Sequence, residues 1–203
     1  MSKPVWWLMT LLAIGVGGYG LAFALLPGFA ESSHMAHHFE QRPLAMYGHF
    51  TLGPLALIIG AFQFLPVGSG RKPNWHRIIG RFYLVCCVGA GIAGIWMAFD
   101  SVAGLVSGIG LFLLGVYWLI TTGMGYLRAR AKNFGSHREW MIRSYALTYA
   151  GVTLRIQLGL AIPVMGYDFF EAYPVIAWSC WVPNALFAEW LLRRPTRLTA
   201  PAV

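Results

Sequence analysis

Long apolar runs separated by short polar stretches set the pattern of this sequence. A transmembrane helix needs about 20 consecutive, mostly apolar residues. Six runs reach that length, over residues 5–29, 45–67, 78–99, 102–127, 140–165 and 173–192. The apolar part of the first run is too long for a signal peptide, so we expect it to be retained as a helix. The pattern predicts an all-α, polytopic integral membrane protein with six transmembrane helices.

Small and polar residues recur at steps of three and four within the second, third and fifth runs. That spacing keeps side chains on one face of a helix. The three stripes are His49-Gly53-Ala56-Gly60-Gln63, His76-Gly80-Tyr83-Cys87-Ala90-Gly94 and His137-Met141-Ser144-Thr148-Gly151-Arg155. Faces of this kind pack against other helices or line a cavity more often than they contact lipid. We therefore expect these three helices to share an interior.

Composition supports the membrane class. The 203 residues are 58% hydrophobic and only 11% charged, whereas a soluble domain carries about a quarter charged residues. The chain also holds 24 glycines and 9 tryptophans, and both residue types are enriched in or beside membrane helices. In a soluble protein the net charge of +8 would suggest nucleic acid; here we attribute it to topology. The expected partner is the lipid bilayer, not nucleic acid.

Basic residues gather on one side of the predicted membrane. With six spans, both termini and the second and fourth connections share a side, and 13 of the 15 Lys and Arg residues lie in them or in the adjoining helix starts. Because cytoplasmic loops are enriched in Lys and Arg, we expect both termini to be cytoplasmic. Ser136 and Glu139, in the fourth connection, are spaced as in a capping box, which predicts that the fifth helix begins there. We expect one domain over residues 1–203.

Two polar clusters follow from the stripes and this topology. The cytoplasmic cluster comprises Gln63, His76, Arg81 and His137, with Glu189 on the same side, and the outer cluster comprises His49 and Arg155. A charge at membrane depth costs about 2.5–3.5 kcal/mol, and it is usually paired or faces a cavity. No acidic residue stands at the expected depth of Arg155. A bound anion, a haem propionate, a quinone carbonyl or backbone carbonyls would satisfy it.

A histidine-rich stretch lies on the outer side, between the first two spans. It holds His34, His37 and His38 beside Glu31 and Glu40. In a helix, His34 and His38 would be one turn apart, a spacing that suits a metal ion. The alternative, which we favour, is a solvated histidine-rich loop without a metal.

These residues together resemble a family of bacterial predicted membrane proteins, the domain of unknown function number 2306. The resemblance covers about residues 45–160. It rests on His49, then Gln63-Phe64-Leu65-Pro66, then His76-Arg77 with Gly80, Arg81 and Tyr83, then His137-Arg138 with Trp140, Met141, Arg143 and Ser144, then Arg155. It implies a multi-pass protein of the bacterial inner membrane, with no established activity. It also implies that His49, His76, Arg81, His137, Trp140, Arg143 and Arg155 are important.

Three functions fit this pattern. The first is a small binding protein or accessory subunit of a larger membrane complex, with a His- and Arg-lined interior that binds lipid or another ligand. The second is a b-type cytochrome linked to quinone, with His76 and His137 as axial ligands and arginines on the propionates. The third is a membrane enzyme that uses a divalent metal ion held by histidines. The sequence leaves open whether the protein is an enzyme.

Overall fold

The structure is a computed structural model that describes residues 3–26, 34–65 and 74–194. Over these ranges the chain forms nine helices and no strand. The helices are α1 (Lys3–Leu25), α2 (Ala36–Gln41), α3 (Pro43–Gln63), α4 (Asn74–Ala98), α5 (Gly104–Arg130), α6 (Phe134–Thr148), α7 (Ala150–Ala161), α8 (Phe169–Ser179) and α9 (Val182–Arg193). The predicted all-α class is confirmed.

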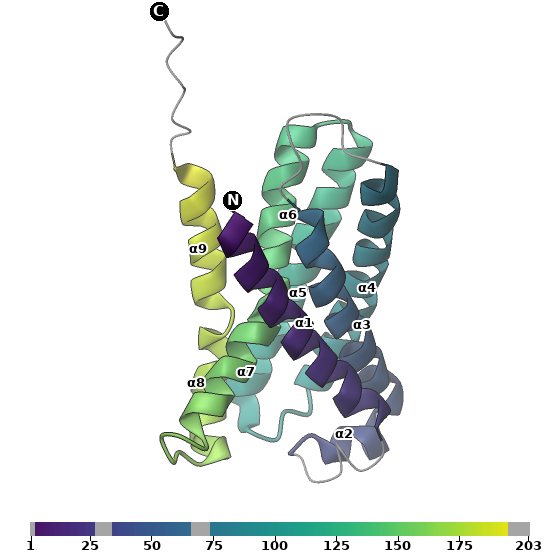
Figure 1. Cartoon of the computed structure of the whole chain (residues 1–203). Coiled ribbons are helices and arrows are strands. Elements are labelled where there is room, and N and C mark those ends of the chain that lie inside the picture. Colours follow the sequence, from purple (N-terminus) through teal and green to yellow (C-terminus); the bar gives the residue numbers. More distant parts are fainter. Residues whose placement is uncertain (1–2, 27–33, 66–73, 195–203) are drawn as a thin grey trace, which may run out of the picture.

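The helices run back and forth between two ends of the molecule (Figure 1). The first end, called here the terminal end, holds Lys3, Arg194 and the α5–α6 connection. The second, called here the α2 end, holds α2 and the connections at residues 99–103 and 162–168. α1 packs obliquely across α3. Each long helix therefore connects the two ends.

Five segments are long and apolar enough to cross a membrane: α1, α3, α4, α5 and the α8–α9 segment Phe169–Arg193. They coincide with five of the six predicted spans, which confirms a polytopic membrane protein. The region of the remaining span, 140–165, is occupied mainly by α6 and α7, which meet at Tyr149 and follow one another along the bundle (Figure 1). The total of six spans and the cytoplasmic position of the termini stay predictions.

The predicted start of the fifth helix at Ser136 is wrong. α6 begins at Phe134, and the side chain of Asn133 accepts a hydrogen bond from the backbone N–H of Ser136 at 3.1 Å. Asparagine is as good an N-terminal cap as serine, and Asn133 stands where its side chain reaches the third N–H of the helix. Ser136 is thus the capped residue and not the cap.

The three stripes meet in the core, as predicted. Tyr83 of α4 is 1% exposed, and its hydroxyl lies 2.9 Å from Ser144 Oγ and 2.8 Å from Thr148 Oγ1, both on α6. Tyr145 of α6 donates its O–H to the carbonyl of Leu57 on α3 at 3.0 Å. The shared interior of the second, third and fifth predicted helices is therefore confirmed.

α5 also contributes to this core, which the stripes did not predict. Trp118 Nε1 donates to Thr148 Oγ1 at 2.9 Å, and Thr122 Oγ1 lies 2.7 Å from Ser144 Oγ. These two α5 residues, with Tyr83, Ser144 and Thr148, form what is called here the hydroxyl network. Each of the five side chains is buried and has a hydrogen-bond partner within the network.

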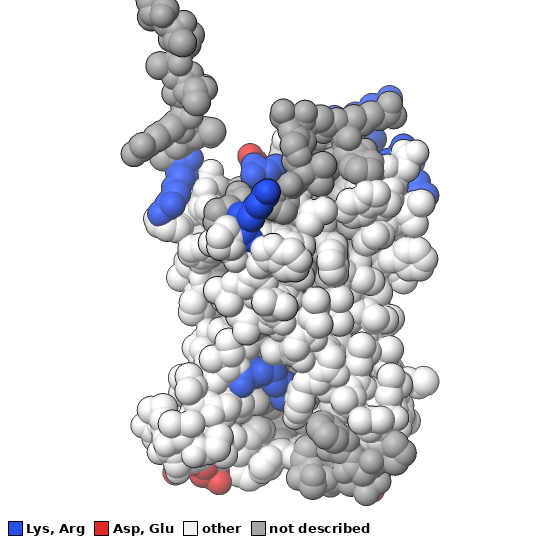
Figure 2. Space-filling view, in the orientation of Figure 1, with Lys and Arg blue, Asp and Glu red and all other residues white. Residues whose placement is uncertain are grey.

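The surface between the two ends is apolar. On the face shown in Figure 2, most basic side chains lie at the terminal end, acidic ones are seen at both ends, and a broad belt between the ends is uncharged apart from one basic patch nearer the α2 end. Leu11, Val85, Leu105 and Leu186, on four different helices, are each more than half exposed. A continuous apolar surface of this size would be unfavourable in water. It contacts the hydrocarbon of the lipid bilayer.

Candidate ligand-binding cavity

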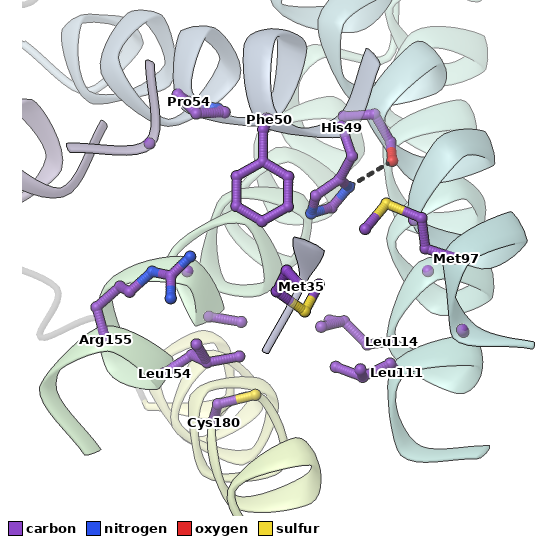
Figure 3. A pocket seen from close by; sticks show the side chains of 18 of the residues that line it. Met35, His49, Phe50, Pro54, Met97, Leu111, Leu114, Leu154, Arg155 and Cys180 are labelled. Carbon is purple, nitrogen blue, oxygen red and sulfur yellow. Dashed lines mark hydrogen bonds between the residues drawn. The ribbon is translucent and has the colours of Figure 1, made fainter. Parts of the chain in front are cut away.

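A cavity of about 230 Å³ lies inside the bundle (Figure 3), and its lining includes Trp118 of the core and His38 of the α2 end. Residues of α1 through α8 line it, and most of them are apolar. The polar groups among them include His38, His49 and Arg155. The predicted outer cluster, His49 with Arg155, is thus brought together around one cavity.

His49 on α3 is oriented by the backbone of α4. Its Nδ1 lies 2.9 Å from the carbonyl oxygen of Ala90. A carbonyl only accepts, so Nδ1 carries the hydrogen, and Nε2 of the neutral ring is left as an acceptor. Gly94 makes room for the ring, because a Cβ at that position would lie 2.9 Å from Nδ1. Figure 3 shows the second ring nitrogen turned toward the cavity.

Arg155 on α7 turns its guanidinium toward Phe50 at the edge of the cavity (Figure 3). Its Cζ lies 5.9 Å from the centre of the Phe50 ring and 5.2 Å from that of Tyr19. Within the described part of the chain it has neither an ion pair nor a hydrogen bond. A cation over an aromatic face gains about 0.5–2 kcal/mol, which does not replace a counter-charge or hydrogen-bond acceptors.

The inner wall of the cavity is fixed by the hydroxyl network. Trp118 and Thr148 belong both to that network and to the lining. Their hydrogen-bonding groups already have partners, since Thr148 also donates to the carbonyl of Ser144 at 2.9 Å. On this wall the hydrogen-bonding groups of Trp118 and Thr148 are therefore already satisfied within the protein.

α2 covers the opposite side of the cavity. His38 is 2% exposed, lines the cavity, and its Nδ1 has no hydrogen-bond partner within the described residues. Burial is the main cause that lowers the pKa of His38 to about 4, and the neighbouring His37 and Arg42 act in the same direction, against the carboxylate of Asp100. His38 is therefore uncharged at neutral pH.

Polar and aromatic contacts hold α2 against the bundle. Arg42 forms an ion pair with Asp100 and donates to the carbonyl of Trp96 at 3.1 Å. His37 Nε2 lies 3.1 Å from the carbonyl of Asp100. The ring of His34 stacks on Phe169 with 4.0 Å between centroids. These contacts explain why α2 packs on the bundle although it has only six residues.

The expectation of a solvated loop is therefore wrong for His38, which is buried in α2, whereas His34 precedes α2 and is exposed. His34 stacks on α8, His37 contacts the α4–α5 connection and His38 is buried. The proposed metal ligands have three different environments, although the rings of His37 and His38 lie 3.8 Å apart. Across the described ranges, no three His, Cys, Asp or Glu side chains are grouped so that they could hold a metal ion. Glu31 lies outside these ranges.

The residues of the predicted cytoplasmic cluster lie near the terminal end, and Gln63 Oε1 would be 3.7 Å from a Cβ at Gly80, one turn after His76. Arg81 is exposed, and the ring of His76 lies 6.3 Å from that of Trp75. His137 Nδ1 lies 2.8 Å from the carbonyl of Gly125 on α5. The amide nitrogen of Gln63 is buried without a partner in the described structure. None of these four residues lines the cavity described above.

Two features of the structure were not predicted. Arg143 donates from Nε to Glu189 Oε1 at 2.5 Å and from Nη2 to Oε2 at 3.1 Å, a paired geometry that joins α6 to α9. Aromatic residues of α5 and α8, among them Trp118 and Tyr173, line the cavity. On α5, however, Gly115, Trp118, Thr122 and Gly125 recur at steps of three and four and are buried, so helical spacing could have found this face.

A family model described as "Predicted membrane protein (DUF2306)" matches residues 46–192. The match confirms the resemblance seen in the motifs and extends it, because it runs through α8 and nearly to the end of α9. The family therefore includes the last helix, beyond the residues 45–160 covered by the resemblance. No curated protein and no solved structure matches this chain.

Proposed function

The chain belongs to the DUF2306 family of predicted membrane proteins, and we propose that it is a membrane-embedded binding protein. Its ligand is a small amphiphile whose head carries oxygen atoms that accept hydrogen bonds. The head lies against Arg155 and His49, and the apolar remainder lies along the leucine, methionine and aromatic side chains of the cavity. If the protein is an accessory subunit of a larger membrane complex, we propose that it acts there by binding this ligand.

The observation that carries the proposal is the guanidinium of Arg155 at the edge of an apolar cavity without an acidic partner in the described structure. Inserting such a charge costs about 2.5–3.5 kcal/mol. We expect a purely structural arginine to donate hydrogen bonds from its N–H groups to carbonyls or carboxylates. Arg143, half-buried and paired with Glu189, illustrates that alternative in the same protein. A ligand oxygen would accept hydrogen bonds from Arg155, as the carboxylate of Glu189 accepts them from Arg143.

The size of the cavity weighs against haem at this position. An engineered cavity of about 150 Å³ accommodates benzene. A porphyrin joins four five-membered rings and needs several times that space, whereas this cavity measures about 230 Å³. The dispersed histidines likewise give no support to a metal-dependent enzyme. Binding of a smaller ligand remains the function that the geometry favours.

We further propose that the terminal end faces the cytoplasm of a bacterium, with the protein in its inner membrane. The described basic residues support this orientation, because they lie mainly at that end and cytoplasmic segments favour Lys and Arg. The α2 end, with Asp100, Asp168 and Glu171, then faces outward. The cavity lies in the outer half of the membrane.

The test is to identify what the protein retains on purification. Wild type, Arg155→Gln and Arg128→Gln are purified in mild detergent, and small molecules extracted from equal amounts of protein are compared by mass spectrometry. Arg128 is an exposed arginine near the terminal end and serves as the matched control. We expect one compound to be enriched in wild type and Arg128→Gln and depleted at least about tenfold in Arg155→Gln. Equal amounts in all three proteins, or no enriched compound, would refute the proposal.

A further inference from the structure

The polar groups of the cavity differ in hydrogen-bonding character, and this difference specifies the ligand. Arg155 offers only N–H donors. His49 offers an acceptor, because its single ring hydrogen is directed to the carbonyl of Ala90 at 2.9 Å. A matching ligand must therefore both accept from Arg155 and donate to His49. The inference below rests on the function proposed above and concerns the same site.

Common membrane amphiphiles meet this requirement to different degrees. A carboxylate accepts from Arg155 but has no hydrogen to give to Nε2 of His49. A quinone likewise has only carbonyl acceptors. A hydroquinone carries a hydroxyl whose oxygen accepts from the guanidinium and whose hydrogen is donated to the imidazole. A buried acceptor that stays unsatisfied costs about 1–3 kcal/mol, so this difference affects affinity.

The dimensions and lining of the cavity suit a single substituted ring. A cavity of roughly 150 Å³ holds benzene. The volume here is about 230 Å³, and the difference leaves space for a few substituents on the ring. Phe50, Trp118 and Tyr173 are among the residues that line it, and aromatic side chains pack favourably on a flat ring. In the view of Figure 3, Arg155 lies at the left and His49 at the upper right, with the Phe50 ring between them and Leu154 and Leu114 below.

We infer that the cavity binds the ring of a hydroquinone, with one hydroxyl between Arg155 and His49. The hydroxyl oxygen accepts from the guanidinium, and its hydrogen is donated to Nε2 of His49. Any isoprenoid or alkyl tail extends along the apolar lining toward the lipid. The reduced form of the ring is preferred over the oxidised form, because only the reduced form satisfies His49.

The test compares three probes on the whole protein in lipid nanodiscs, under argon and by calorimetric titration. The probes are tetramethylhydroquinone, tetramethyl-1,4-benzoquinone and decanoate. For wild type we expect the hydroquinone to bind about tenfold more tightly than the quinone. His49→Leu should remove that preference, and His49→Gln, which retains an acceptor, should keep part of it. Arg155→Gln should weaken both ring compounds.

The outcomes separate this inference from the proposed function. If decanoate binds through Arg155 and neither ring compound does, the hydroquinone inference is wrong and the amphiphile function stands. If both ring compounds bind equally and His49→Leu changes nothing, the assigned role of His49 is wrong. If none of the three probes binds and no compound depends on Arg155 after purification, both proposals fail. Thermal unfolding of each variant, compared with wild type, identifies any loss of binding that comes from misfolding.

Discussion

Replacing Gly94 by alanine tests how the ring of His49 is held. A Cβ at Gly94 would lie 2.9 Å from Nδ1 and 3.0 Å from Cε1 of His49, closer than unbonded carbon atoms normally approach a ring. The ring must therefore move away from α4. Its hydrogen bond to Ala90, now 2.9 Å long, would be lengthened or lost.

Two opposing effects set the expected magnitude. Loss of a buried hydrogen bond that leaves donor and acceptor unsatisfied costs about 1–3 kcal/mol. A glycine-to-alanine change in a helix gains about 0.5–1 kcal/mol from helix propensity. We therefore expect Gly94→Ala to lower the free energy of unfolding by about 1 kcal/mol. For a chain of this size, that lowers Tm by about 2–4 °C.

Gly48→Ala is the matched control. A Cβ at Gly48 would lie 3.6 Å from the Cβ of Ala93, an ordinary contact, so this variant gains helix propensity without displacing a ring. Thermal unfolding of both variants and wild type in the same detergent should place Gly94→Ala below wild type and Gly48→Ala at or above it. If Gly94→Ala is as stable as Gly48→Ala, the His49–Ala90 hydrogen bond does not hold the ring as argued.

Three further predictions concern α2 and the core. The pKa of His38 is lowered from the usual 6.5 to about 4. At a pH between these two values, His38 is therefore protonated in the unfolded chain but not in the folded protein. Stability should therefore persist above pH 6.5 and decline toward pH 4, less steeply in His38→Asn, and equal pH profiles in thermal unfolding would contradict this. Arg42→Gln, which removes the ion pair with Asp100, should raise deuterium uptake in Ala36–Gln41 while lowering global stability by no more than about 1 kcal/mol; unchanged uptake would show that other contacts hold α2. Tyr83→Phe, which removes two buried hydrogen bonds, should cost about 1–3 kcal/mol in unfolding experiments, whereas Tyr149→Phe, whose contact with Met9 O is 3.4 Å long, should cost little; equal losses would be evidence against the hydroxyl network.

Helical periodicity predicted the part of the fold that depends on local sequence. The stripe from His76 contains Tyr83, the stripe from His137 contains Ser144 and Thr148, and these residues meet in the core. Small and polar residues on one face can be satisfied only by another helix, so their spacing alone identifies buried faces. The same spacing placed His49 and Arg155 at similar depths, and both line the cavity.

The burial of His38 was not predicted, because it depends on contacts between segments that are distant in the sequence. His38 is buried because Arg42 and His37 bind the α4–α5 connection at Asp100, about 60 residues away in the chain. A histidine-rich stretch gives no local sign of such contacts, so it resembles a solvated loop. The start of α6 was missed for a different reason, because Asn133 satisfies the capping rule three residues before the more conspicuous Ser136.

The polar groups of the interior fall into two kinds, and their positions differ. The hydroxyl network, built around Tyr83, is satisfied by its own members, so it stabilises one arrangement of α4, α5 and α6 without needing a ligand. Nδ1 of His38 is buried without a hydrogen-bond partner in the described structure, and His38 lines one cavity together with His49 and Arg155. Unsatisfied groups of this kind lower stability, and apolar side chains at the same positions would avoid that loss. The ligand-binding role proposed above would give the polar groups around the cavity their missing partners, beside a wall that is already satisfied.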